Sequence, residues 1–378
     1  MIEVALLGVV IGFLSGLVPG IHTNLIAVLV VSFQADGFLS SVFLVAVAVS
    51  RSISDTLPTI FLGASDDVLS LLPSHQLLKK GKGLEAVFLS VAGSLFGCLA
   101  SVALLPLFVL AFPFLVMLVK PVLFWLLLAG IFVLFLQERK IWGVIIFVFA
   151  GVLGIVTLSS VQNPLFPLLS GLFGASGLVL SIKNRSVIPT QRERSKVKGK
   201  SLLSSLVGAG AAAVMLLFPG LGPSQAASLV AGKRSPSSFL VLTGALGTAD
   251  VVLSLAALAV AGKARNGAVV MIQSLLGTLS FSTTATLLGA SLAAAGLATI
   301  GALLFAPVYA RLFEYFDYSV LCCIVLAFLF VLVMALSGWR GILVFVTATA
   351  LGTLAPLKGV RRSHAMGCLL IPTLVALW

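Results

Sequence analysis

Apolar residues occur along this chain in long runs, and short polar segments separate them. A helix needs about 20 residues to cross the hydrocarbon core of a bilayer, and most of the runs are of that order. A strand of a membrane β-barrel would instead alternate apolar and polar residues. The pattern predicts an all-α polytopic membrane protein. Membrane spans are expected at 40–63, 84–112, 121–137, 141–158, 164–182, 237–261, 267–297, 318–337, 341–356 and 364–378.

The composition narrows the class of protein further. Of the 378 residues, 60% are hydrophobic and only 9% are charged, whereas a soluble domain has about 25% charged residues. An ordinary water-soluble enzyme and a disordered chain are therefore excluded. The four cysteines all lie inside apolar runs and form no Cys-x-x-Cys pair, so we predict neither a metal site nor a disulfide framework.

A polar, basic segment at residues 183–200 divides the chain into two parts of similar length. Both parts carry, in the same order, a Pro-Gly pair, an acidic residue in a following span, a loop rich in glycine and basic residues, and a tryptophan with a glycine one or two residues later. These features are Pro19-Gly20, Asp55, 79–83 and 142–143 in the first part, and Pro219-Gly220, Asp250, 262–267 and 339–341 in the second. We therefore expect a first membrane repeat at 1–182, a cytoplasmic linker at 183–200 and a second, inverted membrane repeat at 201–378.

Each Pro-Gly pair lies near the middle of its apolar run. Residues 4–18 and 20–33 would form helices of about 15 residues, or roughly 22 Å, which is too short to cross a bilayer. Two short helices that meet at Pro-Gly are typical of a re-entrant hairpin, which enters and leaves the membrane on one side. The second hairpin is expected at 202–232. The alternative is one long helix kinked at Pro19.

The formal net charge of +12 is consistent with this topology. In membrane proteins basic residues collect in cytoplasmic loops, so the charge does not indicate nucleic-acid binding. With one hairpin and five spans in each repeat, 18 basic residues lie inside, and those of the whole 183–200 segment are among them. Four lie outside, namely Lys120, Lys263, Arg265 and Arg340. We predict a multi-pass protein of the cytoplasmic membrane with both termini outside.

Inverted repeats with broken helices are typical of secondary transporters whose site lies near the midplane of the bilayer. A hairpin tip leaves backbone groups unpaired, and this is tolerated in a membrane where the groups line a cavity or bind a ligand. Helix N-termini also attract anions. The alternative is that the hydroxyl groups only satisfy local backbone. The candidate substrate-binding residues at the tips are Pro19, Gly20, His22, Thr23, Asn24, Pro219, Gly220, Gly222, Ser224 and Gln225.

Charged side chains inside the spans are the other candidates, because an uncompensated charge in a membrane is costly. Arg51, with Ser52 and Ser54 beside it, is predicted to bind a carboxylate or phosphate. The alternative is a structural pair between Arg51 and Asp55, which follows four residues later. Asp250 stands alone in its span, and together with Thr248 and Asp55 it is a candidate for binding a coupling ion or a proton.

Several motifs resemble the large membrane subunit of the tripartite tricarboxylate transporter (TctA) family, in the short form that archaeal members have. They are Gly16-x-x-Pro19-Gly20, Pro219-Gly220-Leu221-Gly222-Pro223, and the Pro-bearing stretches at 57–63 and 73–83. The resemblance implies secondary transport of di- or tricarboxylates, driven by a Na⁺ or H⁺ gradient, with the substrate between the two Pro-Gly tips. It also implies a small membrane subunit and a soluble binding protein as partners. A homo-oligomer is left open.

Two other functions remain open from the sequence. A related family carries polyprenyl phosphate across membranes and has similar Pro-Gly motifs, and Arg51 with hydroxyl-rich tips would suit a lipid phosphate as well as a carboxylate. An intramembrane enzyme would need a nucleophile or an acid/base pair, and the spacing of His22, Arg51, Asp55 and Asp250 supports none. We therefore predict a transporter and not an enzyme, without a cofactor apart from a coupling ion.

Overall fold

The structure is a computed structural model. It describes residues 1–18, 36–61, 80–136, 140–184, 201–218, 235–315, 318–360 and 362–377, together with residues 23, 26, 27, 30, 74, 76–78, 226, 227 and 230. Every regular element in these ranges is a helix, as predicted. Within the described residues, seven helical stretches are long and apolar enough to cross a membrane. The coarse prediction of an all-α polytopic membrane protein is therefore confirmed.

The helices before the basic segment are α1 (Ile2–Leu17), α3 (Gly37–Ser54), α4 (Thr56–Phe61), α6 (Gly83–Ala103), α7 (Leu105–Val119), η1 (Lys120–Val122), α8 (Leu123–Leu136), α9 (Ile141–Ser160), α10 (Leu165–Leu169), η2 (Ser170–Ala175) and α11 (Ser176–Asn184). Those after it are α12 (Ser201–Met215), α14 (Pro236–Ala261), α15 (Gly267–Leu276), α16 (Phe281–Tyr315), α17 (Tyr318–Leu357), η3 (Arg362–Met366) and α18 (Gly367–Leu377).

Several expected spans have different limits in the structure. The break expected between 112 and 121 is absent, since helical residues run from Leu105 to Leu136. The span expected at 84–112 is divided at Leu104 into α6 and α7, because Pro106 favours a new helix start there. The span expected at 267–297 is divided into α15 and the much longer α16. The break follows Gly277, whose φ of 67° lies in the left-handed region that glycine tolerates. The boundary expected between 337 and 341 is correct, since α17 has non-helical dihedrals at Gly338.

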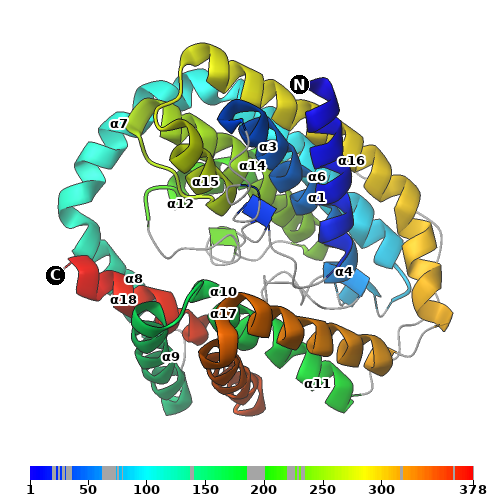
Figure 1. Ribbon diagram of the computed structural model, residues 1–378, viewed down its shortest axis with the longest axis vertical. Helices are drawn as coiled ribbons and strands as arrows, with labels where there is room; N and C mark the ends of the chain where they lie inside the picture. The colour runs from blue at the N-terminus through cyan, green and yellow to red at the C-terminus, as the bar shows by residue number, and fades with distance from the viewer. Residues whose placement is uncertain are drawn as a thin grey trace.

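The helices form two groups (Figure 1). The first bundle contains α1, α3, α4, α6, α12, α14, α15 and α16, and the second contains α9, α10, η2, α11, α17, η3 and α18. The segment α7–η1–α8 runs from the first bundle, where α7 packs on α14, to the second, where α8 packs on α18. Each bundle therefore contains helices from both sides of the basic segment.

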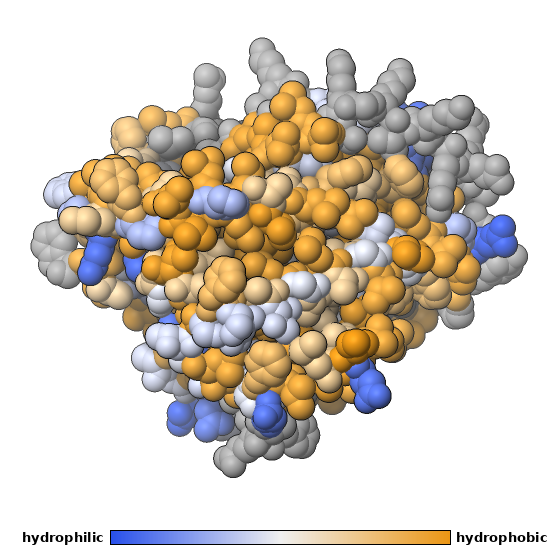
Figure 2. Space-filling model, turned by 90° about the horizontal axis from the view of Figure 1, so that it is seen from above, coloured by the Kyte–Doolittle hydropathy of each residue, from blue (hydrophilic) through white to orange (hydrophobic). Residues whose placement is uncertain are grey.

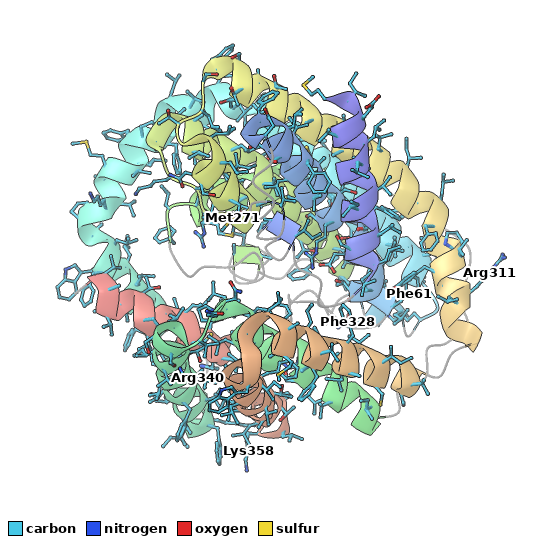
Figure 3. All side chains as sticks on the ribbon, in the orientation of Figure 1. Phe61, Met271, Arg311, Phe328, Arg340 and Lys358 are labelled. Atoms are coloured by element: carbon cyan, nitrogen blue, oxygen red, sulfur yellow. The ribbon has the colours of Figure 1, made fainter. Side chains whose placement is uncertain are left out.

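The surface fits a membrane environment. On the face drawn in Figure 2, hydrophobic residues predominate and the most hydrophilic residues lie toward the edges. Figure 3 places Arg340 and Lys358 on the second bundle and Arg311 near the end of α16. The window of the α7–α8 segment is only 11% buried within the chain, so lipid can cover most of this helical segment.

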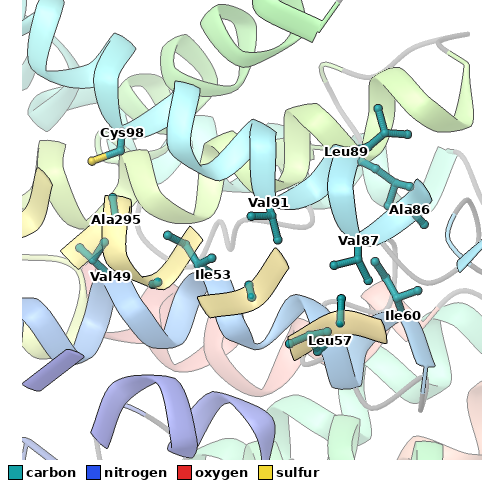
Figure 4. Close-up of a cluster of buried hydrophobic side chains, with 14 of the residues drawn as sticks. Val49, Ile53, Leu57, Ile60, Ala86, Val87, Leu89, Val91, Cys98 and Ala295 are labelled. Atoms are coloured by element: carbon teal, nitrogen blue, oxygen red, sulfur yellow. The ribbon is translucent and has the colours of Figure 1, made fainter. Parts of the chain in front are cut away.

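Most residues in the core of the first bundle are small or β-branched (Figure 4), and they include Val49 and Ile53 of α3, Val87 and Val91 of α6, and Ala295 of α16. Glycines allow α6 and α14 to approach closely. A Cβ atom at Gly93 would overlap the carbonyl oxygen of Val241, and one at Gly97 would overlap the backbone of Ala245. Small residues at helix contacts are the usual basis of packing between membrane helices.

Close contacts of the same kind occur on both sides of the basic segment. A Cβ atom at Gly8 of α1 would lie 2.7 Å from the carbonyl oxygen of Phe43 in α3, and one at Gly208 of α12 would lie 2.7 Å from that of Leu242 in α14. In the second bundle a Cβ atom at Gly154 of α9 would overlap the carbonyl oxygen of Cys368 in α18. One at Gly352 of α17 would overlap that of Leu172 in η2. Gly8 corresponds to Gly208 and Gly154 to Gly352, and the two members of each match lie about 200 positions apart in the chain.

These contacts give a testable consequence for stability. We expect Gly154→Ala to destabilise the protein by about 1–3 kcal/mol, because the methyl group must displace the backbone of α18. Gly296→Ala in α16 is the matched control, since no atom outside its own helical turn lies within 4 Å of its Cβ position. Thermal unfolding in detergent should show a lower midpoint for Gly154→Ala and an unchanged or higher one for Gly296→Ala. Equal midpoints for the two variants would contradict the contact.

Candidate functional site

Most of the predicted tip residues lie outside the described residues. These are Pro19, Gly20, His22, Asn24, Pro219, Gly220, Gly222, Ser224 and Gln225. Thr23 is described as helical and half-buried. The structure does describe the residues directly before each Pro-Gly segment. It also describes side chains that contact these preceding residues. The candidate site is therefore built from the ends of α1 and α12 and from α3 and α14.

The end of α1 is held from two sides. After Leu17 the backbone becomes extended at Val18, with φ −102° and ψ 111°. The hydroxyl group of Tyr309 in α16 donates a hydrogen bond of 3.2 Å to the carbonyl oxygen of Leu17. On the other side, a Cβ atom at Gly16 would lie 2.9 Å from the carbonyl oxygen of Arg51. A carbonyl group left without an intrahelical partner is thus satisfied just before the first Pro-Gly segment.

Arg51 lies in the last turn of α3 and is only 9% exposed. Ser54 is also buried, and its Oγ donates to the carbonyl oxygen of Arg51 at 3.3 Å. Ser52 is half-buried and faces α14, since a Cβ atom at Gly247 would lie 2.9 Å from its Oγ. Asp55 follows α3 directly, and its backbone N–H donates to the carbonyl oxygen of Arg51 at 2.9 Å. The structure therefore places these four predicted residues together at the end of α3.

Asp250 lies in α14 and is 8% exposed. Its Oδ2 accepts a hydrogen bond of 2.7 Å from the side-chain amide of Asn266, whereas its Oδ1 is buried and accepts no hydrogen bond within the described part of the chain. Ser254, one turn further along α14, accepts hydrogen bonds at its Oγ from the backbone N–H groups of Arg265 and Asn266, at 3.1 and 3.0 Å. The loop between α14 and α15 therefore folds back onto α14.

Arg265 connects this loop to the second Pro-Gly segment. Its guanidinium group donates a hydrogen bond to the carbonyl oxygen of Phe218, the residue directly before Pro219. Burial lowers the pKa of Arg265 from its ordinary value, and the nearby Asp250 carboxylate opposes that shift. The sequence suggested that Asp250 stands alone in its span. In the structure it lies near the cation Arg265 and accepts a hydrogen bond from the side-chain amide of Asn266. No local pattern in the sequence indicated that Arg265 and Asn266 return to Asp250.

Thr248 occupies another face of α14. Its Oγ1 donates to the carbonyl oxygen of Ser94 in α6 at 2.6 Å and lies 3.3 Å from that of Ala245. Its hydroxyl group thus joins two helices of the first bundle. Among the described residues, no group of three or more His, Cys, Asp or Glu side chains could hold a metal ion.

The geometry brings buried Arg51 to the end of α1 and Arg265 to the end of α12, beside two segments of like sequence. A family model for the tripartite tricarboxylate transporter TctA family matches residues 2–367. The chain belongs to the TctA family. This confirms the resemblance seen in the sequence, and because the family consists of transporters, it also confirms that the protein is not an enzyme.

The TctA-family chain is also similar to an uncharacterized protein of Methanocaldococcus jannaschii. The two are 27% identical over 395 residues, which cover 98% of this chain and 97% of the relative. The match covers almost all of both chains, so this chain is similar in length to an archaeal relative, consistent with the short form inferred from the sequence. No solved structure matches the chain. TctA proteins are the tricarboxylate transporter membrane subunits that work with TctB and TctC subunits in tripartite transporters.

Proposed function

We propose that this TctA protein is a secondary-active transporter that binds a di- or tricarboxylate near the midplane of the membrane, between its two Pro-Gly segments. The observation that carries the proposal is the end of α1, which stops directly before Pro19 while buried Arg51 packs against its last turn. The contact joins Gly16 to the backbone of Arg51, and a buried arginine on a helix that adjoins an interrupted helix can supply the positive charge that an anionic substrate needs in a low-dielectric site.

The two repeats are proposed to have inverted topologies, each with a re-entrant hairpin. The matched pairs Gly8–Phe43 and Gly208–Leu242 support equivalent roles for α1–α3 and α12–α14. In this arrangement the 183–200 segment lies in the cytoplasm and both termini lie outside, as the distribution of basic residues favours. The helices flanking each Pro-Gly pair would then approach the midplane from opposite sides.

Each group of residues has a proposed role. Arg51 binds a substrate carboxylate by two parallel hydrogen bonds, and Ser52 and Ser54 shape its surroundings. The backbone and polar side chains of the two tips complete the binding site. Asp55, Asp250 and Thr248 form the pathway of the coupling cation, Na⁺ or H⁺. A small membrane subunit and a soluble binding protein would deliver the substrate.

Uptake of radiolabelled citrate into proteoliposomes tests this function. We expect citrate to exchange across the membrane, and a Na⁺ or H⁺ gradient to drive its accumulation. Empty liposomes and liposomes with dissipated gradients are the controls. The assay is repeated with the small membrane subunit present, because the family works as a tripartite system. Absence of carboxylate exchange in both preparations, with translocation of a polyprenyl-phosphate analogue in a parallel assay, would favour a lipid-phosphate carrier and refute the proposal.

A further inference from the structure

A partly buried polar cluster that the sequence did not predict joins the α14–α15 loop to α14. Asp250, Ser254, Arg265 and Asn266 form it, with hydrogen bonds from Asn266 to Asp250 and from two backbone N–H groups to Ser254. The loop begins at Gly262, whose φ of 61° allows the chain to reverse directly after α14. Three separate hydrogen bonds thus fix the position of Arg265 and Asn266 relative to α14.

Arg265 reaches the second Pro-Gly segment, because its guanidinium group binds the carbonyl oxygen of Phe218. A guanidinium group has five N–H donors in a planar fork that matches a carboxylate. The nearby Asp250 provides negative charge and has a buried Oδ1 that accepts no hydrogen bond among the described residues. The cluster therefore presents both a cation with donors for an anion and a carboxylate oxygen that can accept a cation.

We propose that Arg265 is a second anchor for the substrate anion, and that Asp250 balances its charge until a coupling cation binds Asp250. The inference rests on the proposed function and adds to it a residue and a mechanism of coupling. Binding of a cation at Oδ1 of Asp250 neutralises the carboxylate and leaves the charge of Arg265 uncompensated. A carboxylate of the substrate then compensates it.

Charge balance makes the two binding events cooperative. In a low-dielectric site, addition of an anion alone leaves an excess negative charge near Asp250, and addition of a cation alone leaves an excess positive charge near Arg265. Addition of both restores neutrality. By thermodynamic linkage, the cation must raise the affinity for the anion by the same factor as the anion raises the affinity for the cation. Such reciprocity is what ion-coupled uptake requires.

The surroundings of Asp250 contain few other charges. Among the elements that pack against α14, the helices α7, α12 and α15 carry no acidic, basic or histidine side chain. Arg51 lies on α3, and Asp55 follows this helix directly. Glu85 lies on the first turn of α6, where it pairs with Lys82 at 3.4 Å. The charged residues of α16 are Arg311 and Glu314, in its last two turns. The cation dependence is therefore assigned to Asp250 with Arg265.

Citrate binding to the purified full-length protein tests the inference. The variants are Arg265→Gln/Asp250→Asn, which removes both charges together and so avoids a lone buried charge, and Lys263→Gln. Lys263 is exposed in the same loop, so its variant is a matched control for loss of one positive charge. Citrate affinity is measured while Na⁺ replaces choline at constant pH, and again while the pH is lowered without Na⁺. Comparison with the double variant corrects for protonation of citrate itself.

We expect the wild type and Lys263→Gln to bind citrate more tightly as one of the two cations increases. The double variant should bind about 10- to 100-fold more weakly at saturating cation, which is the value of a charge-assisted hydrogen bond, and should lose the cation dependence. A double variant with wild-type affinity, or with weak binding that keeps the full cation dependence, would overturn the inference and leave the proposed function intact. No citrate binding by the wild type would overturn both.

Discussion

Replacement of Arg51 with lysine is expected to lower citrate transport, measured as kcat/KM, by about 10- to 100-fold while the protein remains folded. Lysine keeps the positive charge at this buried position but cannot form the two parallel hydrogen bonds that a guanidinium group makes with a carboxylate. Loss of such charge-assisted bonds costs about 1.5–3 kcal/mol. Initial rates of citrate uptake in proteoliposomes, normalised to the amount of folded protein, measure the effect.

A double variant distinguishes substrate binding from charge compensation. If Arg51 served only to neutralise Asp55, Arg51→Ala/Asp55→Ala would transport normally. If Arg51 binds the substrate, the double variant should be as impaired as Arg51→Lys or more so. Arg51→Ala alone would not decide, because removal of one partner of a buried pair can cost about 3–5 kcal/mol in stability. Normal transport by a stable double variant would show that Arg51 is not part of the anion site.

Asp250→Asn is expected to abolish accumulation of citrate against a gradient, whereas citrate exchange should persist. Asparagine is similar in size and can still accept the hydrogen bond from Asn266, so the fold of the α14–α15 loop should be retained. However, asparagine carries no charge for a cation to neutralise. Exchange needs no net movement of the coupling ion, so it does not require that charge. Accumulation under an imposed Na⁺ or pH gradient and exchange at equilibrium are measured with the same proteoliposomes.

Ser254→Ala is the matched control for Asp250→Asn, because it disturbs the same loop without a change in charge. It removes the acceptor of the backbone N–H groups of Arg265 and Asn266. If Asp250 carries the coupling charge, Ser254→Ala should lower exchange and accumulation together, but leave their ratio near that of the wild type. Ion-driven accumulation by Asp250→Asn at every pH tested would show that Asp250 has only a structural role in the bundle.

The sequence predicted the helical class, most of the membrane spans and the family, because long apolar runs and the Pro-Gly motifs are local signals. It also predicted a break near 337–341, where Gly338 leaves the helical conformation. The breaks at Leu104 and after Gly277 were not predicted, although Pro106 and Gly277 were visible in the sequence. The hydrophobic pattern continues across both breaks, and hydropathy does not distinguish one long helix from two shorter ones.

The contacts of Asp250 could not be predicted in the same way. A helical pattern relates residues three or four apart, so it identified Asp55 near Arg51 but left Asp250 alone. Its actual neighbours, Arg265 and Asn266, return to it through a reversal of the chain after α14. The sequence order of the two halves paired Asp250 with Asp55. In the structure Gly8 contacts Phe43 and Gly208 contacts Leu242, and with these contacts aligned Asp250 corresponds to Arg51.

The crossing of α6 and α14 determines when the first bundle can form during translation. Ser94 of α6 donates a hydrogen bond of 3.1 Å to the carbonyl oxygen of Gly244, and these residues are 150 positions apart. At a synthesis rate of about 5–20 residues per second, roughly 8–30 s pass between the emergence of the two residues from the ribosome. During that interval the Ser94 hydroxyl group can bond only within its own helix, to the carbonyl oxygen of Ser90 at 3.1 Å. A ribosome stalled after the basic segment would hold a chain without α14. The contact between α6 and α14 could not form in that chain.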